Sequence, residues 1–304
     1  MLLLFFCGLA CFLAGMQIMK LGFEKISLSK IKNILLRFTS SPVRGALTGA
    51  VITSIIQSSS AVTVIAIGLV NVGAMTFPQT IGIILGTNVG TTVTAQIITL
   101  DITKWSPFFV GVGISLIPLK KSKLRFIGQA FLGFGLIFLG LKWMTLAVEP
   151  LKYLPVTKKF LASGNNNLLL TMLISTSLTA LFQSSSTIIG MTLALAAQGL
   201  IELQGAVAVV LGSNIGTCIT AILAAAGGSP AARRVAMAHV LLNMAGAIIF
   251  FPIIEPFSYL ISLTSSNLPR QIANAHTIYN IISSLAILPF SNWYAHVVEF
   301  ICRE

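Results

Sequence analysis

Two stretches of this chain repeat each other, beginning with residues 53–95, TSIIQSSSAVTVIAIGLVNVGAMTFPQTIGIILGTNVGTTVTA. These align without a gap on residues 179–221, TALFQSSSTIIGMTLALAAQGLIELQGAVAVVLGSNIGTCITA, at a constant offset of 126. The stretches are identical at 14 of 43 positions, whereas chance in so biased a composition would give roughly 4. The identities gather at two strings: QSSS, and a glycine-rich string that reads GTNVGTT first and GSNIGTC second. The chain therefore contains a duplicated unit.

The duplication reaches beyond these two stretches. Upstream, five residues match five others at an offset of 125: Phe6, Gly8, Gly15, Met19 and Glu24 match Phe131, Gly133, Gly140, Met144 and Glu149. The repeats therefore cover about residues 1–100 and 126–226. Further on, AMAHVLLN (236–243) is echoed by ANAHTIYN (273–280) at an offset of 37, within a C-terminal helix pair expected at about 233–290. We assign residues 1–304 to a single transmembrane domain.

The composition indicates the class of protein. Of the 304 residues, 56% are hydrophobic and only 9% are charged, whereas soluble domains carry roughly 25% charged residues. We therefore expect an all-α polytopic protein that crosses the cytoplasmic membrane of the cell several times. The apolar runs around the two QSSS strings are shorter than the roughly 20 residues that a spanning helix needs. Short, interrupted segments at corresponding places predict broken or re-entrant helical hairpins at a transporter's binding site.

The basic residues indicate how the repeats are oriented. The net charge is +12, and the basic residues form short clusters between apolar runs, which is typical of cytoplasmic loops and not of a nucleic-acid interface. If segment 20–44 is cytoplasmic and the second repeat is inverted, 13 basic residues lie inside and six outside, in agreement with the positive-inside rule. We therefore predict inverted repeats, so that cysteines near Lys30 and near Ser163 would be labelled from opposite sides.

The QSSS strings predict a binding site. Packing alone is the alternative, because Ser and Thr can bond the carbonyl one turn back and small residues let helices pack closely. Packing does not, however, require a four-residue polar string at both places. We interpret each string as a helix break, where unpaired N–H groups, hydroxyls and the positive helix N-terminus can hold an oxyanion. Carbonyls and hydroxyls freed at the same breaks can coordinate Na⁺.

The glycine-rich strings predict a second break that lines the same cavity. Glycine permits unwound backbone, and the polar neighbours supply oxygens: Thr87, Asn88, Thr91, Thr92, Ser213, Asn214 and Thr217. Cys218 stands where the first repeat has Thr92. We expect its thiol to react with a small polar reagent and to be protected by bound substrate. The alternative is that Cys218 is a small buried packing residue.

The remaining polar residues argue against an enzyme. His239 and His276 each precede an asparagine by four residues, Asn243 and Asn280. They either support the cavity from behind or are hydrogen-bonded core residues. No GxSxG, GxGxxG or P-loop pattern occurs, and the four cysteines form neither a CxxC pair nor a zinc-ligand spacing. No carboxylate lies at the centre of a long apolar run, which favours coupling to Na⁺ over coupling to protons.

Together, these residues resemble the sodium–phosphate cotransporter family (type II Na/Pi, including its bacterial members). The resemblance rests on the duplicated QSSS, the two glycine-rich strings and the tandem AxAHxxxN segments, and it covers about residues 1–290. It implies that the QSSS hairpins meet at a central phosphate and sodium site lined by Gln57, Ser58, Ser59, Ser60, Gln183, Ser184, Ser185 and Ser186. Thr53 and Thr179 precede them in matching positions, and Na⁺ would lie near Gln57, Ser60, Gln183 and Ser186. Many bacterial relatives add a C-terminal PhoU-like helical domain, which we expect this chain to lack.

The function that the resemblance implies is Na⁺-coupled import of inorganic phosphate across the cytoplasmic membrane, without a cofactor. An inside-negative potential opposes anion entrance by about 2.3 kcal/mol per charge per 100 mV, so accumulation would need two or more Na⁺ per phosphate. A phosphate exporter of the same family is one alternative, and a non-transporting membrane subunit or receptor is another. The expected partners are phosphate, Na⁺ and the lipid bilayer. The oligomeric state stays open, a homodimer included.

Overall fold

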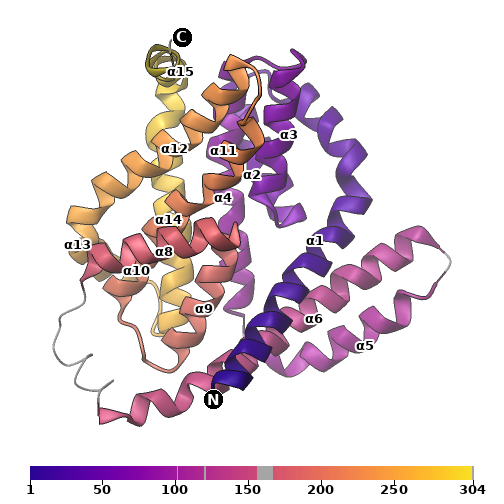
Figure 1. Cartoon of the computed structure of the whole chain (residues 1–304), viewed down its shortest axis with the longest axis vertical. Coiled ribbons are helices and arrows are strands. Elements are labelled where there is room, and N and C mark those ends of the chain that lie inside the picture. Colours follow the sequence, from indigo (N-terminus) through magenta and orange to yellow (C-terminus); the bar gives the residue numbers. More distant parts are fainter. Residues whose placement is uncertain (101, 120, 156–166, 303–304) are drawn as a thin grey trace.

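The computed structural model describes residues 1–100, 102–119, 121–155 and 167–302, and for residues 26–30 it describes the backbone alone. In these ranges every regular element is a helix (Figure 1). The first repeat contains α1 (Leu2–Phe38), α2 (Pro42–Ile56), α3 (Ser59–Asn71) and α4 (Phe77–Ile98). The link to the second repeat contains the short helix η1 (Thr103–Trp105) and α5 (Ser106–Leu116).

The second repeat presents the corresponding helices in the same order. These are α6 (Ser122–Val148), the short η2 (Glu149–Tyr153), α8 (Leu168–Phe182), α9 (Ser185–Ala197), α10 (Leu203–Thr217) and α11 (Ile219–Ala225). The C-terminal part then follows with α12 (Pro230–Phe250), η3 (Phe251–Ile253), α13 (Ile254–Ser262), α14 (Leu268–Ile287), η4 (Leu288–Phe290) and α15 (Ser291–Ile301).

Helix lengths divide the chain into spans and hairpins. Six helical segments of the described chain are long and apolar enough to cross a bilayer, which confirms a multi-pass, all-α membrane protein. The two helices on either side of each QSSS string have 15 and 13 residues. At 1.5 Å per residue they reach about 20–23 Å, short of the roughly 30 Å hydrocarbon thickness. Each QSSS string therefore joins two helices that are too short to span alone.

Helices α1 and α6, the first helices of the two repeats, pack antiparallel along a glycine seam. A Cβ added at Gly8 would lie 2.9 Å from the carbonyl oxygen of Gly140, and one added at Gly140 would lie 2.5 Å from that of Gly8. Gly15 and Gly133 meet in the same reciprocal way. In the repeat alignment Gly8 matches Gly133 and Gly15 matches Gly140. Each helix thus offers the same two positions to the other, which is the contact pattern of a two-fold axis.

The apolar core consists of two clusters of buried side chains. One gathers residues of α9 and α10 with α1 and α6, and the other gathers residues of α3 and α4 with α11 and α12. Each hairpin is therefore held by its own cluster. Outside these clusters, many exposed side chains are large and apolar, such as Leu47, Leu181 and Ile248, as expected for surfaces that face lipid chains.

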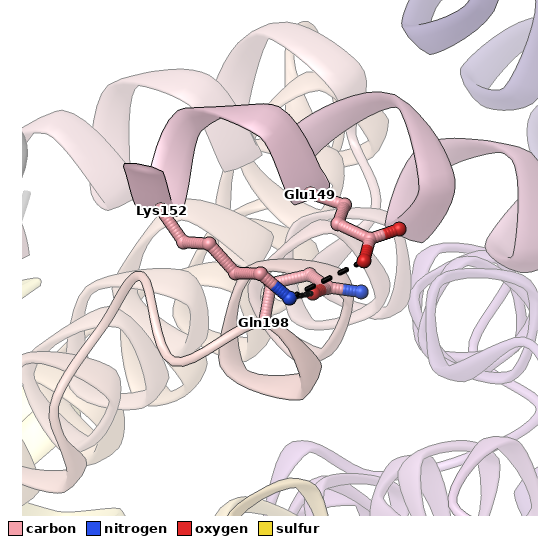
Figure 2. A network of polar contacts seen from close by, with 3 residues as sticks. All are labelled: Glu149, Lys152 and Gln198. Carbon is pink, nitrogen blue, oxygen red and sulfur yellow. Dashed lines mark hydrogen bonds and ion pairs between the residues drawn. The ribbon is translucent and has the colours of Figure 1, made fainter. Parts of the chain in front are cut away.

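A polar contact fixes the segment after α6 to the end of α9. The Lys152 ammonium donates to Glu149 Oε1 and to Gln198 Oε1, both at 3.3 Å (Figure 2). Gln198 is the residue that follows the last turn of α9. This contact therefore connects the long α6 to the second hairpin, at the end of that hairpin away from its QSSS string.

Candidate functional site

Both QSSS strings interrupt their helices in the same way. Gln57 and Gln183 adopt the left-handed conformation, with φ of 60° and 52°, and no other non-glycine residue in the described ranges has a positive φ. The next residue in each string is extended and begins a new helix: the Ser58 hydroxyl accepts from the Ala61 amide, and the Ser184 hydroxyl accepts from the Thr187 amide. These contacts are standard N-terminal caps. The predicted helix breaks thus lie at Gln and the first Ser of each string.

The two breaks meet at one small polar cavity. The described residues that line it are Lys20, Gln57, Ser58, Ser59, Ser60, Thr91, Gln183, Ser184, Ser185, Ser186 and Thr217. Ten of these form five pairs related by the offset of 126 between the repeats. The cavity volume is about 20 Å³, room for about one water molecule. In this conformation the hairpins are therefore closed on each other, and a tetrahedral oxyanion would need them to separate.

Four serine hydroxyls are available to a ligand in this cavity. Within the described part of the chain, Ser59, Ser60, Ser185 and Ser186 make no side-chain hydrogen bond to protein, and their hydroxyls are not among the atoms sealed from solvent. They lie in the first turns of α3 and α9, whose leading amides have no intrahelical acceptor. Two positive helix ends and up to four hydroxyl donors therefore converge on one point, an arrangement suited to an anion.

The first glycine-rich string is helical throughout, contrary to the prediction of a break, whereas the second is interrupted at its last residue, Cys218. Residues 86–92 lie inside the continuous helix α4. Residues 212–217 complete α10, and α11 begins at Ile219, directly after Cys218. The glycines serve close packing instead. A Cβ at Gly86 would overlap the carbonyl oxygen of Ala46 in α2, and one at Gly212 would overlap that of Met172 in α8.

Only one residue of each glycine-rich string reaches the cavity, Thr91 in the first and Thr217 in the second. The Thr87, Thr92 and Ser213 hydroxyls donate to carbonyls of their own helices, those of Ile84, Val89 and Val210. These three side chains are buried. The structure therefore places them behind the cavity wall and not among its lining residues.

The asparagines of the two strings are held by the C-terminal helices. Asn88 donates to Asn243 Oδ1 of α12 at 2.8 Å, and Asn214 donates to Asn280 Oδ1 of α14 at 3.0 Å. His239 Nε2 lies 3.1 Å from Asn88 Oδ1, whereas neither ring nitrogen of His276 has a partner in the described chain. The asparagine of each AxAHxxxN segment thus accepts a hydrogen bond from the asparagine of one glycine-rich string.

Cys218 and the two threonines before the QSSS strings are buried away from the cavity. Cys218 is 2% exposed, and its thiol accepts from the Asn243 amide at 3.2 Å. The expectation of a thiol open to polar reagents is therefore not supported, and the packing alternative fits the structure. Thr53 and Thr179 are fully buried, and neither hydroxyl has a partner among the described residues.

The two hairpins differ at their glutamines. Gln57 is 7% exposed, accepts from the Thr94 hydroxyl at 2.7 Å and donates to the Ser54 carbonyl at 2.5 Å. Gln183 is exposed and makes no such contact within the described ranges. Thr220, the counterpart of Thr94, donates to the Thr217 carbonyl instead. The side chain of Gln57 is thus held against α4, whereas the side chain of Gln183 is exposed.

Lys20 is the one cavity residue that the sequence interpretation missed. It was counted with the basic segment 20–44, but α1 continues without interruption to Phe38 and presents Lys20 to the cavity. Its position in the sequence could have indicated this, because Lys20 directly follows Met19, which is matched between the two repeats.

Helices that span a bilayer, paired hairpins too short to span, and a polar cavity where their breaks meet define a multi-pass membrane transporter. A family model described as Na⁺/Pi-cotransporter matches residues 11–146 and 153–265. The chain belongs to this family, which is a family of transporters and not of enzymes.

Three relatives illustrate the range of the family. YqeW of Bacillus subtilis (strain 168) is 36% identical over 292 residues, which are 95% of this chain and 94% of YqeW. YjbB of Salmonella typhimurium (strain LT2), whose name proposes inorganic phosphate export, is 27% identical over 95% of this chain but only 54% of YjbB. The sodium-dependent phosphate transport protein 2C of Mus musculus is 41% identical over 87 residues, 27% of this chain and 14% of its own length. No solved structure is significantly similar to this chain.

Proposed function

We propose that this chain carries inorganic phosphate across the cell membrane together with Na⁺, through the cavity between the QSSS hairpins. The observation that carries the proposal is the convergence of two helix N-termini and four unengaged serine hydroxyls on one cavity. Such donors match the oxygens of a tetrahedral oxyanion. Neutral oxygens at the same breaks are ligands that Na⁺ accepts, and the orphaned hydroxyls of Thr53 and Thr179 lie one turn before each break.

Inverted repeats would give this site access to both sides of the membrane. The antiparallel, reciprocal packing of α1 on α6 supports this proposal, as does the difference between the buried Gln57 and the exposed Gln183. In a carrier with two-fold related halves, the halves exchange conformations, so that each side opens in turn. The small cavity between them then corresponds to a closed intermediate of that cycle.

The membrane orientation of the repeats can be tested at matching turns. Ser163, at which we expect labelling from the sequence, lies outside the described residues. Val72 and Ala197 are exposed at the ends of α3 and α9 and are used instead. The two ends lie at opposite ends of the molecule in Figure 1. In a background without native cysteines, Val72→Cys and Ala197→Cys are expected to react with an impermeant maleimide from opposite sides of intact cells or inverted vesicles. Labelling of both from the same side would contradict the inverted arrangement.

Import and export remain two candidate directions. Import follows from coupling to an inward Na⁺ gradient, since two or more Na⁺ overcome the cost of moving phosphate against an inside-negative potential. Export is favoured by the likeness to YjbB, whose name proposes phosphate export. The same potential would drive phosphate outward without any coupling ion.

Reconstituted vesicles decide between these directions. Purified protein in proteoliposomes is expected to take up ³²P-phosphate under an inward Na⁺ gradient, and K⁺ in place of Na⁺ should reduce uptake to the level of empty vesicles. Arsenate, which has the same shape and charge, should compete. Efflux from phosphate-loaded vesicles that is independent of Na⁺ would favour the exporter, and no phosphate flux in either test would contradict the proposed function.

A further inference from the structure

A single lysine breaks the two-fold pattern of the cavity. Lys20 is the one charged side chain among the described residues that line it. Within the described chain, Lys20 makes no hydrogen bond or ion pair, and Glu24 lies one turn further along α1. A lysine near the end of a spanning helix often extends to the membrane surface. Lys20 instead lies half-buried beside both QSSS strings.

The second repeat has no counterpart to this charge. The offset of 125 that matches Met19 with Met144 pairs Lys20 with Thr145, which is neutral. Thr145 lines a different cavity, next to Lys142 and Leu146. All other lining residues of the QSSS cavity come in matched pairs. The positive charge is therefore an addition to an otherwise symmetric set of neutral groups.

We propose that the Lys20 ammonium is the fixed countercharge of the transported anion and sets the affinity of the cavity for it. This inference rests on the proposed function, because it assigns a ligand to the same cavity. The serine hydroxyls and helix ends are neutral groups that fix the geometry of four oxygens. A unit positive charge a short distance away adds an attraction that strengthens as the surroundings lose water.

The same charge has a consequence for the coupling ion. An ammonium group in a small cavity repels Na⁺ while the anion is absent, because like charges at short range in a partly dry site are costly. Bound phosphate neutralises this repulsion.

The test replaces Lys20 with cysteine and then labels the thiol with a reagent that either restores the positive charge or leaves the position neutral. Cys7, Cys11, Cys218 and Cys302 are the native cysteines, and the test uses a background in which all four are replaced. In this background Lys20→Cys is expected to raise the half-saturating phosphate concentration by about 10- to 150-fold, the range for one lost hydrogen bond to a charged group. Aminoethyl methanethiosulfonate, which rebuilds a lysine-like ammonium, should restore affinity, and methyl methanethiosulfonate, which leaves the position neutral, should not.

Three further variants serve as controls in the same assay. Lys25→Cys removes an exposed charge from the same helix, outside the cavity, and should leave the half-saturating concentration unchanged. Lys20→Arg should keep most of the affinity while Lys20→Gln loses it, which covers the case that the cysteine variant does not fold. All three are first checked by size-exclusion chromatography.

The outcomes separate this inference from the proposed function. Wild-type affinity in Lys20→Cys and in Lys20→Gln, or equal restoration by the charged and the neutral reagent, would overturn the role of Lys20. If that result occurs while Ser60→Ala and Ser186→Ala still lose transport, the proposed site stands without the lysine. If the serine variants also transport normally, the site itself is wrong.

Discussion

Replacing Gly86 with leucine is expected to abolish the accumulation of folded protein in the membrane. Helix α4 packs on α2 with backbone in contact, and a Cβ at position 86 would overlap the carbonyl oxygen of Ala46 and approach the amide of Ala50 to 2.7 Å. Added methylenes in a packed core cost about 1–3 kcal/mol, so Gly86→Ala alone should lower stability by that amount. Leucine adds three further carbons, for which α2 leaves no room.

The matched control for this prediction is Gly68→Leu in α3. A Cβ at Gly68 meets no atom within 4 Å, so the two substitutions share the chemistry of the change but not the overlap. Fluorescence-detected size-exclusion chromatography and thermal melting measure the outcome. Gly86→Leu should give no monodisperse peak, and Gly68→Leu should match wild type. Similar behaviour of the two variants would show that α2 and α4 are not packed as described.

The repeat made the fold class and the hairpins predictable. QSSS at one offset marked both helix breaks, because a polar string within an apolar run has few uses in a membrane other than a break or a site. The structure has left-handed backbone at Gln57 and Gln183 and new helices from Ser59 and Ser185. That agreement follows from a physical constraint, since a broken membrane helix must satisfy its freed backbone groups.

The glycine-rich strings were misread because glycine serves two purposes. It permits unwound backbone, and it also lets two helices approach closely. The spacing distinguished these uses: Gly82, Gly86 and Gly90 recur every four residues, and Gly212 and Gly216 continue this spacing in the second repeat. Residues four apart share one face of a helix. That periodicity indicates a packing seam between neighbouring helices.

The partners of the asparagines and the position of Lys20 could not be predicted from local sequence. Asn88 meets Asn243 across 155 positions of the chain, a contact that depends on how α12 returns over the first repeat. To place Lys20 at the cavity, one must know that α1 continues to Phe38. Sequence patterns report the period of a single element, whereas these contacts depend on how several helices cross.

The second large effect is expected when one serine of each QSSS string loses its hydroxyl. Ser60→Ala or Ser186→Ala alone should raise the half-saturating phosphate concentration by about 10- to 150-fold, because a hydrogen bond to a charged ligand is worth about 1.5–3 kcal/mol. Both side chains line the cavity, one from each repeat. The double variant should therefore lose about 10²- to 10⁴-fold if the two costs add, which removes measurable transport at millimolar phosphate.

The double variant also tests whether one ligand touches both hairpins. Two serines outside the cavity provide the matched control: Ser115 and Ser177 each donate to a carbonyl one turn back in their own helix, and Ser115→Ala with Ser177→Ala should transport like wild type. ³²P-phosphate uptake into proteoliposomes across a range of phosphate concentrations gives the affinities of the wild type and of the two single variants, and it shows whether the double variant retains any uptake. If one serine variant alone accounts for the whole loss and the other changes nothing, phosphate binds to a single hairpin, and the paired cavity serves a purpose other than holding the anion.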